Sequence, residues 1–151
     1  MQYDQDYFEG RTSFFYRFGG YRDVETYFGR LARWFLPHAG AGPVLDFGCA
    51  YGFLLARFDD GRPLSGCDVS PWAIQQAERR LPHANFHLLD AEGVLPYGDG
   101  AFDAVLCTDV LEHIEPARQS QVLGEVMRVL TPGGRFCMTT PNQGLMRRWL
   151  Y

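Results

Sequence analysis

The chain has 151 residues, of which 46% are hydrophobic and 21% are charged, and its formal net charge is −4. This composition is typical of a soluble globular protein with one core. The negative charge and the lack of a basic run argue against electrostatic capture of nucleic acid. The apolar stretches are too short to span a membrane, and the amino terminus lacks a signal-peptide pattern, so we expect a cytoplasmic protein.

Residues 1–20 are rich in aromatic side chains and are punctuated by glycines. These rings could pack on the domain as an arm, or form a lid that holds a cation by cation–π contact. Apolar residues at helical spacing then predict an amphipathic helix over 23–36, which Pro37 ends. We therefore expect an arm and helix at 1–42, acting as a lid or cap, and a core at 43–151, within a single domain overall.

The stretch Pro43–Leu55 is an apolar run broken by Asp46, followed by Gly48 and Gly52 and then by apolar residues at helical spacing. This pattern predicts a strand, a tight turn and a helix. The N–H groups at the start of such a helix are unpaired and suit a carboxylate or phosphate. The dinucleotide fingerprint G-x-G-x-x-G fits poorly, because Ala50 and Phe53 replace two of its glycines.

Alternating strands and helices follow this stretch. The expected strands cover 64–68, 85–89, 102–108 and 135–140, and a tight turn at 131–134 precedes the last of them. Two helices are expected to open at Pro71, with Ser70 as its cap, and at Pro116. Such alternation predicts an α/β fold with a Rossmann-like doubly wound, mainly parallel sheet flanked by helices, which binds ligands at the carboxyl ends of its strands.

Three carboxylates fall at or near the carboxyl ends of predicted strands, with 22 residues between successive ones: Asp46, Asp68 and Asp90. This spacing places them around one crevice, where like charges repel unless a ligand uses them. Asp68 lies about 20 residues beyond the glycine turn, where a carboxylate can accept hydrogen bonds from both ribose hydroxyls. The alternative is that Asp68 caps the helix that opens at Pro71.

Four cysteines lie in or beside predicted strands, and no two of them form a C-x-x-C pair: Cys49, Cys67, Cys107 and Cys137. Buried free thiols explain this arrangement better than disulfides or metal ligands. We expect no metal site.

Several of these segments resemble the motifs of class I S-adenosylmethionine-dependent methyltransferases, of the type 11 kind that acts on small molecules. The stretch 46–52, Asp-Phe-Gly-Cys-Ala-Tyr-Gly, resembles the first motif, with Ala50 in place of its middle glycine. The stretch 64–70 resembles the second acidic motif, and 90–92 the motif that flanks the adenine. Residues 102–113 and 128–136 resemble the fourth motif and the turn into the fifth strand, so the resemblance covers roughly 43–142.

The resemblance implies S-adenosylmethionine as cofactor and S-adenosylhomocysteine as product. It places Asp68 on the ribose, the Asp90 carboxylate on the adenine amino group, and the Ala91 N–H near a ring nitrogen. Val69 could cover the adenine face, and Trp72 is the alternative, although its place on the helix favours the core. The expected cofactor-binding residues are Asp46, Gly48, Cys49, Ala50, Gly52, Asp68, Val69, Asp90, Ala91, Glu92 and Thr108.

The expected reaction is an in-line transfer of a methyl group to a small-molecule acceptor, and alignment alone can lower much of its barrier. If the acceptor is a hydroxyl or an acid, a base is useful, and the candidates are His113, Asp109 and Tyr7. Imidazole suits this task near neutral pH. The alternative for His113 is a loop histidine that satisfies a backbone carbonyl.

The family's sheet usually has two more strands than this chain can form before Tyr151. We therefore expect a fold that lacks the last strands, and a possible homodimer through the open sheet edge or the carboxyl-terminal tail. We expect a small-molecule substrate, and neither nucleic acid nor membrane as a partner. One alternative is a non-catalytic or truncated S-adenosylmethionine-binding module that acts through a partner subunit, and another is an NAD-dependent oxidoreductase.

Overall fold

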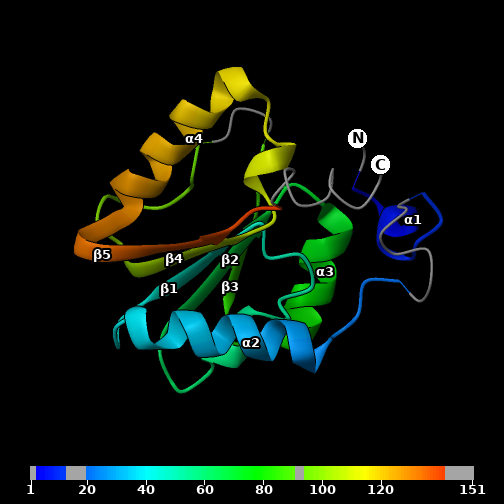
Figure 1. The fold of residues 1–151 in the computed structure, drawn as a ribbon, viewed down its shortest axis with the longest axis horizontal. Coiled ribbons are helices and arrows are strands. Elements are labelled where there is room, and N and C mark those ends of the chain that lie inside the picture. Colours follow the sequence, from blue (N-terminus) through cyan, green and yellow to red (C-terminus); the bar gives the residue numbers. More distant parts are fainter. Residues whose placement is uncertain (1–2, 13–19, 91–93, 142–151) are drawn as a thin grey trace, which may run out of the picture.

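A computed structural model of the chain describes residues 3–12, 20–90 and 94–141. The strands form one five-stranded sheet, and Figure 1 shows helices on both of its faces. The strand order is β3-β2-β1-β4-β5, and each neighbouring pair is parallel. The strands are β1 (Val44–Phe47), β2 (Leu64–Asp68), β3 (Asn85–Leu88), β4 (Phe102–Thr108) and β5 (Leu130–Thr139). The predicted Rossmann-like α/β fold is thereby confirmed.

The helices connect these strands and cover the sheet. The α-helices are α1 (Gln5–Phe8), α2 (Glu25–Phe35), α3 (Pro71–Arg80) and α4 (Pro116–Val129), and the 3₁₀ segments are η1 (Leu36–His38), η2 (Leu55–Phe58) and η3 (Leu111–His113). α3 begins as the sequence predicts, since Ser70 Oγ accepts a hydrogen bond from Ala73 N and Pro71 is the first helical residue.

Two apolar layers sandwich the sheet, because successive strand residues point to opposite faces. Val44 packs with Phe28 and Leu31 of α2, whereas Leu45 packs with Val122 and other residues of α4. Figure 1 shows α2 and α4 on opposite sides of the sheet. α2 therefore shares the core with the strands.

The crevice expected for a ligand lies where the strand order reverses. β1 pairs with β2 on one side and with β4 on the other. The chain runs outward from β1 through β2 to β3, and then crosses back to β4 and runs outward to β5 on the other side. The carboxyl ends of β1, β2 and β4 meet at this point, which is where open parallel sheets bind ligands.

Two local predictions were wrong. The helix expected after Gly52 is only the four-residue 3₁₀ segment η2, which ends because the backbone leaves helical geometry at Asp59. The turn expected at 131–134 is an irregularity inside β5, in which Leu130 pairs with Phe102 and Arg135 with Ala104. The extra residues bulge out of the ladder, with Gly133 at φ 83°.

Within the described ranges, β5 pairs only with β4. The carboxyl-terminal tail lies outside the described residues, so a homodimer through this edge or through the tail stays a prediction. None of the helices in the described part of the chain is long and apolar enough to cross a membrane.

Candidate functional site

The turn after β1 needs backbone conformations that favour glycine. Gly48 and Gly52 have φ values of 79° and 71°, in the left-handed region. A Cβ atom on Gly48 would also collide with the side chain of Val110. Ala50, which replaces the middle glycine of the motif, has φ 45° and so carries a methyl group in a conformation that L residues avoid.

The N–H groups of this turn are used inside the protein. Gly48 N and Cys49 N both donate to Cys67 O, at 2.8 and 3.0 Å, and Ala50 N donates to Asp68 Oδ2 at 2.9 Å. Gly52 N donates to Cys49 O at 2.8 Å. These four donors are therefore used within the protein, and the expectation that unpaired N–H groups after this turn bind the ligand stays a prediction.

Asp46 lies beneath this turn and is 2% exposed. Its Oδ1 has no hydrogen-bond partner among the described residues, while the backbone N–H of Leu55 bonds to the carboxylate. The pKa of Asp46 is raised to about 7, mainly by burial and then by the charge of Asp68, while the hydrogen bond from Leu55 N–H lowers it. The site therefore holds a carboxyl group that takes up a proton near neutral pH.

Asp68 ends β2 and holds two loops together. Its Oδ2 accepts from Ala50 N, and its Oδ1 accepts from Ser70 N at 2.9 Å. The second bond matches the alternative in which Asp68 braces the start of α3. Burial raises the pKa of Asp68, and the bonds from Ser70, Ala50 and Val69 N–H lower it. Carboxylate oxygens have two lone pairs each, so both can still accept from a ligand.

The other predicted cofactor residues surround these acids. Val69 is 53% exposed at the tip of β2, and Asp90 is exposed beyond β3. Thr108 is half-buried at the end of β4 and pairs with Thr139. Cys49 is buried, and burial raises the pKa of its thiol well above the ordinary value. Ala91 and Glu92 lie outside the described residues.

The three candidate bases lie in two places. Asp109, at φ 54°, accepts from the hydroxyl of Tyr27 on α2 and, at 3.1 Å, from Thr139 Oγ1. His113 is exposed in η3, and its ring centroid is 5.8 Å from that of Tyr3. Tyr3 in turn lies 5.0 Å from Tyr7. His113 and Tyr7 thus lie on either side of Tyr3 in one row of rings, whereas Asp109 is hydrogen-bonded to Tyr27 of α2.

Sequence reasoning missed the contact between Tyr27 and Asp109, which are 82 residues apart, and no local pattern signals it. It also favoured the core for Trp72, which is only partly buried and donates from Nε1 to the Tyr51 hydroxyl at 2.9 Å. In the described part of the chain, no group of three or more His, Cys, Asp or Glu side chains is arranged to hold a metal ion.

Comparison with known proteins identifies the fold and the family. The family described as "Methyltransferase domain" matches residues 45–138, more than half of the chain. A demethylmenaquinone methyltransferase from Beutenbergia cavernae is 39% identical over 100 residues, which cover 64% of this chain and 40% of that protein.

Two solved structures share the architecture. The PH0226 protein from Pyrococcus horikoshii OT3 matches with a TM-score of 0.68 at 29% identity, over 95% of this chain and 63% of that one. The [4+2]-cyclase SpnF matches with a TM-score of 0.66 at 26% identity, over 76% of this chain and 47% of that one. The chain spans about half or less of the length of the curated relatives that it matches. The family match nevertheless covers the glycine turn and both acidic strand ends, and the chain belongs to the methyltransferase domain family, with S-adenosylmethionine as its cofactor.

Proposed function

We propose that this chain is the cofactor-binding and catalytic part of an S-adenosylmethionine-dependent methyltransferase that acts on a small molecule. One observation carries the proposal. A buried carboxylate, Asp68, ends β2 directly beside a left-handed glycine turn at the switch point of a parallel sheet. The carboxylate suits the hydroxyls of a ribose, and the glycine turn suits a neighbouring part of the same ligand that lies close to the backbone.

The residues present fit the cofactor. Asp68 supplies acceptors for the ribose hydroxyls, and the exposed Val69 offers an apolar surface for the adenine face. Asp46 has a buried oxygen with no partner among the described residues, which suits a ligand with a cationic amino group. Gly48, where a Cβ would collide with Val110, lets the turn pack closely against the segment that follows β4.

In this proposal the bound cofactor supplies a methyl group on a cationic sulfonium, and the chain supplies alignment. The acids orient the ribose and the amino-acid tail, and the arm excludes water from above. Tyr3 supports this role for the arm 1–42, because its ring centroid lies 5.8 Å from that of His113, in the segment that follows β4.

For the acceptor we propose a small molecule with an aromatic or quinol ring, in keeping with the name of the relative that acts on demethylmenaquinone. His113 is then the best-placed base for a ring hydroxyl. Both oxygens of Asp109 already accept hydroxyl hydrogen bonds, whereas the His113 ring is exposed beside Tyr3. Tyr7 joins the same row of rings and can order the acceptor.

The proposal is tested by the thermal unfolding of the protein with S-adenosylmethionine, S-adenosylhomocysteine and, separately, NAD. A ligand at 100 times its dissociation constant stabilises by about 2.7 kcal/mol. In a chain of this size that raises the melting temperature by about 5–10 °C. We expect this shift with both adenosyl ligands and none with NAD; a shift with NAD alone would contradict the proposal.

Val69→Glu supplies a variant that spares the fold, because the side chain is 53% exposed. We expect it to weaken adenosyl binding at least tenfold, since it adds bulk and charge where the adenine is placed. Met127→Glu, on α4 with 64% exposure, is the matched control and should bind normally. Equal affinities of the two variants for the adenosyl ligand would contradict the placement of the adenine beside Val69.

A second candidate is an S-adenosylmethionine-binding module that transfers no methyl group. The structural similarity to SpnF supports this second candidate, because that protein is described as a [4+2]-cyclase and not as a methyltransferase. Turnover of S-adenosylmethionine to S-adenosylhomocysteine with a panel of phenolic and quinol acceptors separates the two. Binding without turnover, with the protein shown to be folded, would favour the module.

A further inference from the structure

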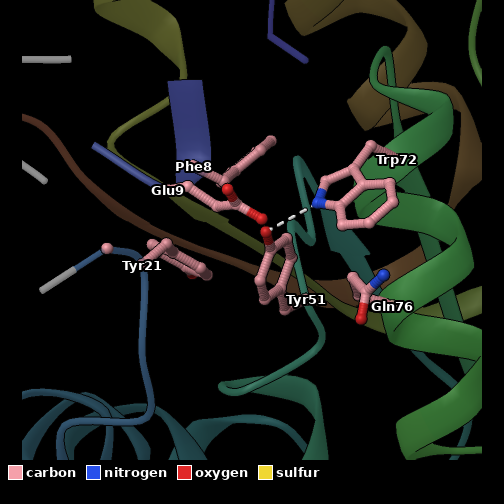
Figure 2. A pocket seen from close by; sticks show the side chains of 7 residues that line it. Phe8, Glu9, Tyr21, Tyr51, Trp72 and Gln76 are labelled. Atoms are coloured by element: carbon pink, nitrogen blue, oxygen red, sulfur yellow. Dashed lines mark hydrogen bonds between the residues drawn. The ribbon is translucent and has the colours of Figure 1, made fainter. Parts of the chain in front are cut away.

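A pocket of about 350 Å³ lies between α1, the chain at Gly20 and Tyr21, the glycine turn and the start of α3 (Figure 2). The described side chains that line it are Phe8, Glu9, Tyr21, Tyr51, Trp72 and Gln76. None of the acids assigned to the cofactor is among them. Among the described residues the pocket is open on one side, so a small ligand can enter it.

Four aromatic rings form the walls of this pocket. The ring centroid of Tyr51 lies 5.0 Å from that of Phe8 and 5.2 Å from that of Tyr21. Figure 2 shows the hydrogen bond from Trp72 Nε1 to the Tyr51 hydroxyl, which fixes the indole in place. Ring faces carry negative electrostatic potential and attract cations. The neighbouring ring of Phe53, which stacks on Tyr21, already holds a cation, since the Arg80 guanidinium lies 4.1 Å from its centroid.

The charge of the pocket is also negative. Glu9 is its one charged side chain among the described residues. Its carboxylate pairs with Arg11 at 2.8 Å and accepts from Gln5, but Arg11 is 65% exposed, and exposed pairs of this kind exchange readily. Gln76 Nε2 is buried and has no partner in the described part of the chain, so the wall also offers an N–H donor to an oxygen of a ligand.

We propose that this pocket binds a small organic cation of the methylated-ammonium class, separately from the adenosyl cofactor. A primary ammonium would need three acceptors, and the pocket offers few, since the Tyr51 oxygen already accepts from Trp72. A trimethylammonium group needs none. It gains contact with the rings over its methyl groups and attraction from the ring faces and from Glu9. The proposal does not depend on methyl transfer.

Titration of the ¹⁵N-labelled chain with choline tests this. The Trp72 indole N–H signal, assigned by its loss in Trp72→Phe, reports the pocket directly. The control ligand is 3,3-dimethylbutan-1-ol, which has the shape of choline without its charge. An advantage of 1–2 kcal/mol from the charge makes choline about 5- to 30-fold tighter. Equal affinity for the two ligands, or no movement of the Trp72 signal, overturns the proposal.

Three variants sharpen the test. Glu9→Gln should weaken choline binding at least threefold, and Arg11→Gln should strengthen it, because Arg11 competes for the same carboxylate. Trp34→Leu, exposed on α2, should leave it unchanged. The titration is repeated with the protein saturated with S-adenosylhomocysteine. Retained binding supports a separate site, whereas competition would assign the pocket to the cofactor and overturn the proposal.

Discussion

Asp46 makes the stability of this protein depend on pH in an unusual direction. Its pKa rises from the ordinary 3.8 to about 7 in the folded protein, because it is buried and lies near Asp68. Between these values the native state holds a proton that the unfolded chain has released. Stability is therefore highest at the acid end of this range and falls as the pH rises through 7. At 1.36 kcal/mol for each pH unit the whole effect is about 4 kcal/mol, of which about 3 kcal/mol falls above pH 5.

Asp46→Asn should remove this dependence, because an amide does not titrate and its oxygen can still accept from Leu55 N. We expect urea unfolding, followed by circular dichroism without ligand, to show that the wild-type chain loses about 2–3 kcal/mol between pH 5 and pH 8. The variant should lose clearly less, because only Asp68, whose pKa is also raised by burial, then contributes a slope of the same sign. Asp60 and Glu125 do not contribute to the slope between pH 5 and pH 8, because hydrogen bonds from Arg62 and Arg128 lower the pKa values of these carboxyl groups to about 2.

Leu106→Val is the matched control, since Leu106 pairs with Asp46 across β1 and β4. It should lower stability by about 1 kcal/mol at both pH values and keep the wild-type slope. The reasoning is refuted by a variant Asp46→Asn that loses as much stability as the wild type, or by a wild type with no slope.

Three further predictions concern the glycine turn and the loop beneath α4. Ala50→Gly should stabilise the protein by about 0.5–1 kcal/mol in denaturant unfolding, because relief of the left-handed strain exceeds the entropy cost of glycine; a loss would contradict this. Gly48→Ala should cost about 2–4 kcal/mol, and Val110→Ala in the same chain should recover part of it, so strictly additive costs would rule out the clash. Arg128→Gln should cost about 1–3 kcal/mol, because the guanidinium donates to Leu95 O at 3.0 Å and to Tyr97 O at 2.8 Å. The exposed Arg79→Gln should change stability by less than about 0.5 kcal/mol, and an equal effect in both would refute the role of Arg128.

The sheet could be predicted from the sequence because its strands are short apolar runs bounded by turn residues. β2 and β4 begin and end where predicted, and the helix expected over 23–36 is α2 at Glu25–Phe35. The helix predicted after Gly52 was wrong although Leu54, Leu55 and Phe58 have helical spacing. A single 3₁₀ turn also buries these three side chains in the core. The spacing of apolar residues indicates which face of a segment is buried, but it does not indicate how many helical turns the segment forms.

Candidate site residues could be located by element but not by contact. Spacing placed Asp68 at the tip of β2, yet its bonds to Ala50 N and Ser70 N depend on how two loops meet. The contact of Tyr27 with Asp109 and the pocket beside Trp72 join segments far apart in the chain. Such contacts arise from tertiary packing, which no local pattern encodes.

The central claim is that the carboxyl ends of β1 and β2 hold the adenosyl cofactor. A crystal structure of the protein with S-adenosylhomocysteine tests it most directly. We predict both ribose hydroxyls within about 3 Å of the Asp68 carboxylate, with the homocysteine tail lying against Gly48. A nucleoside bound elsewhere, with Asp68 contacting only Ala50 and Ser70, would contradict the account.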